Sequence, residues 1–223
     1  MGPSKIYTNQ KDFHMKVLLL GATGGTGREI VKRATAKGHW VVAVVRSIAK
    51  AGDLAGATLA EGDARDEALL ARALEGCTGV ISSIGTSVSP FKEVTLLSTA
   101  TRSLVNAMTQ NGVRRLVCIT GLGAGDSRGH GGFVFDNLIM PLLLRKVYDD
   151  KNRQEDLVRA SGLDWVLVRP VVLNDKGGTG KVRADTNLSG IHGGSIARAD
   201  VAQFVVDQLT EDRWLRQAPL IRE

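Results

Sequence analysis

The chain has 223 residues, of which 43% are apolar and 4% aromatic, and this length allows one large domain that needs no disulfide or metal ion. Its formal net charge of +6 suits an anionic ligand, but Lys and Arg form no run, which argues against nucleic acid as a partner. Two separated cysteines and four scattered histidines match neither a disulfide framework nor a metal site, so we expect no metal and a reducing, cytoplasmic compartment.

Residues 1–14 are polar and without pattern, and Met15 begins an apolar run at once. We therefore expect residues 1–14 to be a leader or a disordered extension, and residues 15–223 to form the domain. The first segment lacks the apolar stretch of a signal peptide. The longest apolar runs, such as 17–20, are too short to cross a bilayer, so we expect no membrane partner.

Strands and helices are predicted to alternate about six times after Met15. Short apolar runs predict strands, and helically spaced apolar residues closed by glycine predict helices. The predicted strands are 16–20, 40–45, 57–61, 79–84, 115–120 and 165–169, and the predicted helices are 27–37, 67–75, 96–111, 141–161 and 199–209. This alternation predicts a single α/β domain with a doubly wound parallel sheet, the Rossmann fold. The glycine-rich stretches 121–132 and 174–194 are predicted substrate-side loops, because they follow strand ends.

A glycine-rich turn, GATGGTG at residues 21–27, joins the first strand to the first helix. Its G-x-x-G-x-x-G spacing permits a tight turn, close approach of a pyrophosphate to the backbone, and close packing of helix on strand. The helix N-terminus then offers N–H groups to the phosphates. The predicted cofactor contacts in this turn are Gly21, Thr23, Gly24, Gly25, Thr26 and Gly27.

The end of the second strand indicates which dinucleotide is bound. NAD-dependent proteins place an acid here to accept the ribose 2′-hydroxyl, whereas this chain has Arg46 followed by Ser47. A guanidinium can bind a 2′-phosphate through two hydrogen bonds. We therefore predict NADP(H) as cofactor, with Arg46 and Ser47 as contacts. The alternative is that Arg46 is a solvated residue at the end of a strand.

The segment after the third strand carries two carboxylates with different predicted roles. Asp63, followed by Ala64, is placed to accept a hydrogen bond from the adenine amino group. Asp66 directly precedes a helical run and is the candidate N-cap. The division between these two roles is open, because either Asp could cap the helix.

These motifs together resemble a known family. GATGGTG after the first strand, Arg46 after the second, GD at 62–63, IGT at 84–86 and VRP at 168–170 resemble the atypical short-chain dehydrogenase/reductases. Within them, the chain is similar to the NAD(P)H-binding, NmrA-like branch that includes flavin and biliverdin reductases, and SIARADVA at 195–202 is similar to that branch's late helix entry. The resemblance covers about residues 15–210 and implies six or seven strands. Further cofactor contacts implied by it are Ile84, Gly85, Thr120, Lys151 and Pro170.

The chain departs from the classical catalytic residues of this family, which are Tyr-x-x-x-Lys on the long helix and a Ser after the fifth strand. Lys151, with Glu155 four residues on, resembles the family Lys, but Val147 then stands at the Tyr position. Tyr148 is one residue further, about 100° around a helix, and is expected to face elsewhere. Thr120 stands where the Ser is expected. Lys151, Tyr148 and Thr120 are therefore only weak catalytic candidates, and Lys151 is either a ribose contact or a solvated lysine.

Phe133 and Phe135 follow the first glycine-rich loop and are candidate substrate contacts for a flat ring system, or else aromatic anchors of a core helix. The leading hypothesis is an NADPH-dependent reductase of a flat conjugated small molecule of flavin or quinone type. Such an acceptor takes a hydride without an obligatory side-chain acid. The first alternative is a non-catalytic NAD(P)H-binding redox sensor. The second is a sugar-nucleotide epimerase or dehydrogenase, which the missing Tyr disfavours.

Overall fold

The central sheet has eight strands in the computed structural model, which describes residues 14–86 and 93–223. The strands are β1 (Lys16–Leu20), β2 (Trp40–Val45), β3 (Ala57–Glu61), β4 (Gly79–Ser82), β5 (Arg115–Ile119), β6 (Asp164–Pro170), β10 (Leu220–Arg222) and β8 (Arg183–Asp185). A small second sheet pairs β7 (Val172–Asn174) with β9 (Ser195–Ala197). The helices are α1 (Gly25–Ala36), α2 (Glu67–Ala73), α3 (Leu96–Gln110), the short 3₁₀ turn η1 (Gly125–Ser127), the π-helix η2 (Phe135–Leu144), α4 (Arg145–Ala160) and α5 (Arg198–Asp207).

The strand order is β3-β2-β1-β4-β5-β6-β10-β8, and every neighbouring pair is parallel except β10 with β8. The chain moves outward from β1 to β3, crosses back to β4 and then moves outward the other way. The connections that leave β1 and β4 therefore run to helices on opposite faces of the sheet, which leaves a crevice for a ligand at this reversal of strand order. The predicted doubly wound Rossmann fold is confirmed.

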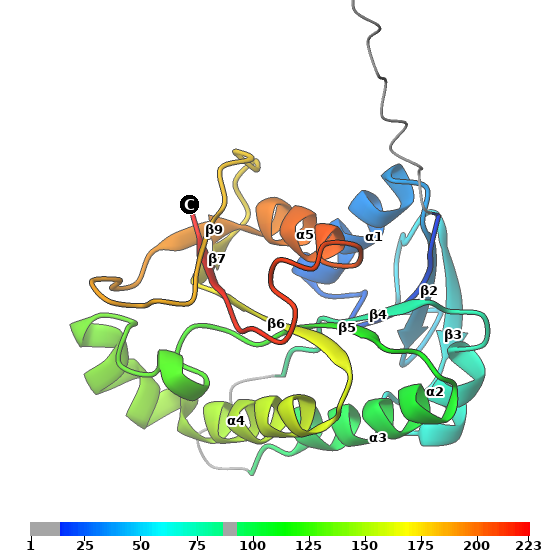
Figure 1. Ribbon diagram of the computed structural model, residues 1–223, viewed down its shortest axis with the longest axis horizontal. Helices are drawn as coiled ribbons and strands as arrows, with labels where there is room; N and C mark the ends of the chain where they lie inside the picture. The colour runs from blue at the N-terminus through cyan, green and yellow to red at the C-terminus, as the bar shows by residue number, and fades with distance from the viewer. Residues whose placement is uncertain (1–13, 87–92) are drawn as a thin grey trace, which may run out of the picture.

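Alternating side chains of the strands supply two separate cores. In β1, Val17 and Leu19 pack with α1 and α5, while Leu18 and Leu20 pack with α2, α3 and α4. Figure 1 shows the result, with α1 and α5 together on one face of the sheet and α2, α3 and α4 on the other. A strand buried on both faces must be apolar along its buried part, which is the pattern of residues 17–20 in β1.

Several observed boundaries differ from the predicted ones, and three of these differences bear on the site. Helix α1 begins at Gly25 rather than Gly27, so the end of the glycine-rich turn is already helical. Strand β4 ends at Ser82, two residues early. The long helix begins as the π-helix at Phe135 rather than at Pro141. Pro141 has no N–H to donate, which disfavours it inside a regular α-helix, and here it lies within the wider turns of the π-helix.

The sequence did not predict strands β7 to β10, and the implied six or seven strands of the sheet are therefore too few. Each of the four missed strands has three residues, which is too short for a period-two pattern to be recognised. The leader predicted for residues 1–14 lies outside the described residues apart from His14, whose Nδ1 is 2.9 Å from the carbonyl oxygen of Gly38. Within residues 14–86 and 93–223, no helix is long and apolar enough to span a membrane.

Candidate functional site

The glycine-rich turn follows β1 and is shaped by two close contacts. Gly21 has φ +82°, and a Cβ there would lie 2.2 Å from the carbonyl oxygen of Ser83. A Cβ on Gly27 would lie 2.1 Å from the carbonyl oxygen of Gly21. Glycine is therefore obligatory at both positions, and it brings α1 against the ends of β1 and β4.

Gly24 has a different reason to be glycine. It is the N-cap of α1 in extended backbone, and a Cβ there would meet nothing closer than 3.5 Å. It caps the helix without a side chain, and the first turn of α1 carries no acid. The N-terminal N–H groups of α1 therefore face an open surface with a positive dipole end, a cradle that fits a pyrophosphate. Thr23 is exposed beside it, whereas Thr26 is buried.

Arg46 and Ser47 lie where β2 ends, on the same edge of the sheet. The Arg46 side chain is exposed, and Ser47 is half-buried. The following loop is held by Arg28, whose guanidinium donates to the carbonyl oxygens of Ala51 (2.7 Å) and Asp53 (2.8 Å). Arg28 also donates to the carbonyl oxygen of Thr23 at 3.2 Å. Its positive charge thus lies between the glycine-rich turn and the Arg46 loop, where it favours an anionic ligand.

The two carboxylates after β3 are separated in role. Asp66 is the N-cap of α2 and accepts from the Leu69 N–H at 3.1 Å, so the predicted cap is confirmed. Both carboxylate oxygens of Asp63 accept from the Arg65 guanidinium, at 2.9 and 2.6 Å. Hydrogen bonds from Arg65 lower the pKa of Asp63 to about 2. Asp63 and the neighbouring Ala64 remain predicted adenine contacts, but Arg65 already engages the carboxylate.

The ends of β4, β5 and β6 place the other implied cofactor contacts at the crevice. Ile84 and Gly85 follow β4, and a Cβ on Gly85 would meet nothing within 4 Å. Thr120 follows β5, and Pro170 ends β6. The ammonium of Lys151, on α4, donates to the carbonyl oxygen of Thr120. Burial lowers the pKa of Lys151, and the half-buried side chain is not a solvated lysine of the helix surface.

A buried ion pair fixes the position of Thr120. The Arg169 guanidinium on β6 donates two hydrogen bonds, of 2.9 and 2.5 Å, to the Glu155 carboxylate on α4, and both side chains are at most 2% exposed. The Thr120 hydroxyl donates to the same carboxylate at 2.7 Å. Removing one member would leave a buried charge without its partner. The pair therefore locks β5, β6 and α4 together and fixes the carbonyl group that receives Lys151.

Tyr148 lies inside the site, so the expectation that it faces elsewhere is wrong. Residues three apart on a helix share a face, and the Lys151 ammonium is 5.9 Å from the Tyr148 ring centroid. The Tyr148 hydroxyl donates to the Leu122 carbonyl oxygen at 2.8 Å. Burial raises the pKa of Tyr148 to about 12. Val147, at the family's Tyr position, is buried.

An apolar cavity of about 760 Å³ opens beside these groups. Phe133, Phe135 and Tyr148 line one side, and residues 170–173 line another. The Phe135 ring meets the Tyr148 ring edge-on, with centroids 6.3 Å apart. Phe133 lines the cavity although 84% of it is exposed. Both predicted phenylalanines therefore reach the same cavity, which leaves their role in substrate binding a prediction.

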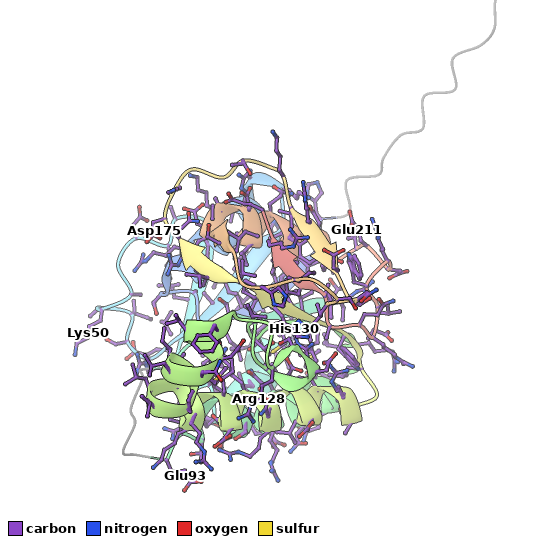
Figure 2. All side chains as sticks on the ribbon, turned by 90° about the vertical axis from the view of Figure 1, so that its left-hand side faces the viewer. Lys50, Glu93, Arg128, His130, Asp175 and Glu211 are labelled. Atoms are coloured by element: carbon purple, nitrogen blue, oxygen red, sulfur yellow. The ribbon has the colours of Figure 1, made fainter. Side chains whose placement is uncertain are left out.

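The two glycine-rich loops meet at this cavity. His130 accepts from the Gly193 N–H through its carbonyl oxygen at 2.7 Å, and its Nδ1 is 3.2 Å from the Ile191 carbonyl oxygen. The His130 and His192 rings stack with centroids 6.5 Å apart. His130 lies near the centre of Figure 2, and the residues that it contacts belong to the loop between β8 and β9. Both predicted substrate-side loops therefore contribute to the cavity wall.

Sequence reasoning did not assign a role to Arg198, the first residue of α5. Its side chain lines the cavity and also lies over the glycine-rich turn, because a Cβ on Gly25 would be 2.9 Å from its Cδ and Nε. The sequence motifs also assigned no role to Arg169. Both residues stand in motifs that carried the family resemblance, VRP and SIARADVA, and only the tertiary contacts separate their functions.

Comparison with known proteins agrees with this geometry. A family model described as NAD(P)H-binding matches residues 21–212. An uncharacterized sugar epimerase, YhfK of Bacillus subtilis, is 30% identical over 204 residues, which cover 88% of this chain and 89% of the relative. The photosystem II assembly factor Ycf39 of Synechocystis is 28% identical over 158 residues, but this chain spans only 44% of its length.

Solved structures show the same fold. ChuY, an anaerobilin reductase from Escherichia coli O157:H7, superposes with a TM-score of 0.78 at 26% identity, covering 93% of this chain and 97% of ChuY. A short-chain dehydrogenase/reductase from Veillonella parvula in complex with NADP has a TM-score of 0.73 at 15% identity, covering 94% and 95% of the two chains. The match over residues 21–212, with the glycine-rich cradle and the Rossmann sheet order, shows that this chain belongs to the NAD(P)H-binding family.

Proposed function

We propose that the protein is an NADPH-dependent reductase whose substrate is a flat, conjugated small molecule of flavin or quinone type. The observation that carries this proposal is the apolar cavity walled by Phe135 and Tyr148. It adjoins Thr120 and Pro170 at the strand ends and reaches Arg198 above the glycine-rich turn. A ring system in this cavity would lie at the end of the dinucleotide site where nicotinamide belongs.

The residues present fit the cofactor. The N-terminus of α1 would hold the pyrophosphate, Arg46 and Ser47 would hold the 2′-phosphate, and Lys151 would hold the nicotinamide ribose. When bound, NADPH supplies the hydride. Lys151 is fixed by the Thr120 carbonyl oxygen, so its remaining N–H donors keep a defined direction.

The side chains near the cavity favour an acceptor that needs no proton donor. Classical enzymes of this kind use a Tyr whose pKa is lowered by the neighbouring Lys. Here burial raises the pKa of Tyr148 to about 12, and its proton is directed at the Leu122 carbonyl oxygen. Flavins and quinones spread the incoming negative charge over the ring and take their proton from solvent. Binding and orientation then supply most of the catalysis.

One relative agrees with this substrate class, and one feature favours a rival. ChuY, named as an anaerobilin reductase, covers nearly the whole chain at 26% identity.

The rival is a redox sensor that binds NAD(P)H and reports to a protein partner. It is favoured by the exposed apolar side chains of residues 133–143, which are Phe133, Val134, Leu138, Leu142 and Leu143, because such a surface suits a protein interface.

The epimerase alternative is supported by the name of the Bacillus subtilis relative. A sugar-nucleotide would need polar partners in the substrate cavity, whereas most of this cavity's lining is apolar or backbone glycine. Epimerisation through a keto-sugar intermediate also needs a side chain whose pKa is low enough to give up and take back a proton. The raised pKa of Tyr148 is the opposite of that requirement.

A cavity-filling pair of variants tests the proposal. Ile139 lines the cavity, whereas its neighbour Leu138 is 57% exposed and lies outside the lining. NADPH oxidation, followed at 340 nm over a panel of flavins and quinones, should be lost in Ile139→Trp and kept in Leu138→Trp, while NADPH binding persists in both. Equal rates in the two variants, or no oxidation with any acceptor in the wild type, would reject the proposed reductase.

A further inference from the structure

Arg198 makes contacts that the fold alone does not require. It stands at the junction of β9 and α5, and its Nη1 donates to the Asp175 carboxylate at 2.7 Å. That partner is an exposed residue of the loop after β7, and Figure 2 shows it beside the orange ribbon of α5. The Arg198 side chain itself is 27% exposed. A largely covered guanidinium is thus paired with a carboxylate that is open to solvent.

Gly25 explains how Arg198 reaches the turn. Its backbone does not need glycine, because Gly25 is not among the residues with positive φ and no backbone atom of another element is among the three atoms nearest to its Cβ position. The three nearest atoms to that position from outside the helix all belong to the Arg198 side chain, with Cδ and Nε both at 2.9 Å. The G-x-x-G-x-x-G spacing also places no demand on this position. The missing side chain at Gly25 is therefore the space that Arg198 occupies.

The base of Arg198 is held rigidly. Ile196 and Ala197, which precede it, are fully buried. Asp200, in the first turn of α5, is buried and accepts from the N–H groups of Thr179 (2.8 Å) and Gly180 (2.9 Å). Helix α5 lies beside α1 on the same face of the sheet (Figure 1). The guanidinium therefore stays over the N-terminus of α1, while its carboxylate partner Asp175 lies on a loop.

We propose that Arg198 is a cofactor-binding residue that binds the diphosphate of NADP(H) from the side opposite the α1 N–H groups, with Asp175 as its partner in the free protein. A guanidinium binds phosphate oxygens through two parallel hydrogen bonds. An exposed ion pair contributes little, so exchanging Asp175 for a doubly charged diphosphate is favourable. The proposal depends on the NAD(P)H site and not on the proposed reductase activity, so each can fail alone.

Two other roles for Arg198 are separated by the choice of ligands and variants. If Arg198 only ties the loop after β7 to α1, then breaking the ion pair from either side has the same effect. If it binds an anionic group of the substrate in the cavity, then cofactor affinity in the absence of any acceptor does not depend on it. The decisive comparison is therefore between Arg198→Met and Asp175→Asn, with cofactor fragments and no acceptor.

The experiment titrates three ligands by calorimetry, or by competition with NADPH fluorescence. NADPH and 2′-phospho-ADP-ribose contain the diphosphate, whereas adenosine 2′-monophosphate contains the adenosine and the 2′-phosphate alone. Arg198→Met should weaken the first two about tenfold or more, as expected for charge-assisted hydrogen bonds. It should leave adenosine 2′-monophosphate within about twofold. Asp175→Asn should bind all three as tightly as the wild type, or more tightly.

Three results would overturn the proposal. Equal losses in Arg198→Met and Asp175→Asn would show a structural tie, unchanged NADPH affinity in Arg198→Met would show no contact, and an equal loss for adenosine 2′-monophosphate would place Arg198 elsewhere. Circular dichroism and the thermal midpoint check folding of each variant. If Arg198→Met does not fold, Arg198→Lys answers the question, because it keeps the charge, loses the paired hydrogen bonds and should still weaken the two diphosphate ligands selectively.

Discussion

Replacing Tyr148 with Phe separates the two chemistries open to this site. The change removes one hydroxyl, whose hydrogen bond to the Leu122 carbonyl oxygen is 2.8 Å long, and keeps the ring that meets Phe135 edge-on. A side chain that donates a proton in the transition state contributes about 10²–10⁴-fold to the rate, or about 3–5 kcal/mol. A neutral hydrogen bond lost from the fold costs only about 1 kcal/mol of stability.

We expect Tyr148→Phe to lower kcat by less than about fivefold, well below that catalytic range. The reason is that burial holds the pKa of the hydroxyl at about 12 and that its proton already has an acceptor. Lys151→Met should instead weaken NADPH binding, because its ammonium lies beside Thr120 at the predicted ribose site. Steady-state kinetics with a quinone acceptor, with NADPH affinity measured separately, check both variants. A hundredfold fall in kcat for Tyr148→Phe with intact cofactor affinity would refute this reasoning and restore the classical mechanism.

Three further predictions concern the cofactor cradle and its surroundings. NADPH should bind more tightly than NADH, and Arg46→Ala should remove most of a difference of about tenfold or more; equal affinities in the wild type by calorimetry would contradict it. Gly24→Val should abolish dinucleotide binding while circular dichroism stays unchanged. The backbone of Gly24 is extended and a Cβ there meets no protein atom closer than 3.5 Å, so the fold accepts a side chain, but that side chain would occupy the space predicted for the pyrophosphate. The Asp63 carboxyl should titrate near pH 2 by NMR, and Arg65→Met should return its pKa toward the ordinary value near 4. The contribution of Asp63 to stability is therefore present above pH 4 and is lost as the pH falls toward 2. An unshifted pKa of Asp63 in the wild type would exclude the ion pair.

Long apolar strands were predictable because burial on both faces leaves a continuous apolar run, as in β1 and β2. The strands β8 and β10 were not predictable, since three residues carry no period and their pairing depends on segments far apart in the chain. The start of the π-helix was also not predictable from the sequence pattern. Pro141 marks a helix start in a sequence pattern, whereas the observed helix continues through it.

The candidate site divides in a similar way. The glycine-rich turn and Arg46 were predictable because their spacing from β1 and β2 fixes their place. The position of Tyr148 was wrong because the expectation compared it with Val147 instead of with Lys151, whose helix face it shares. Arg198 lies 173 positions after Gly25, and no local pattern reports that the two touch.

A single-turnover reaction tests the central claim most directly. Protein saturated with NADPH is mixed anaerobically with an excess of an oxidised flavin or quinone, and the cofactor absorbance at 340 nm is followed together with the absorbance of the acceptor. We predict that both absorbances decay with one rate constant and in a ratio of one NADPH to one two-electron acceptor, and that Ile139→Trp abolishes the decay while Leu138→Trp does not. NADPH that stays bound and unoxidised with every acceptor would contradict the account and favour the sensor.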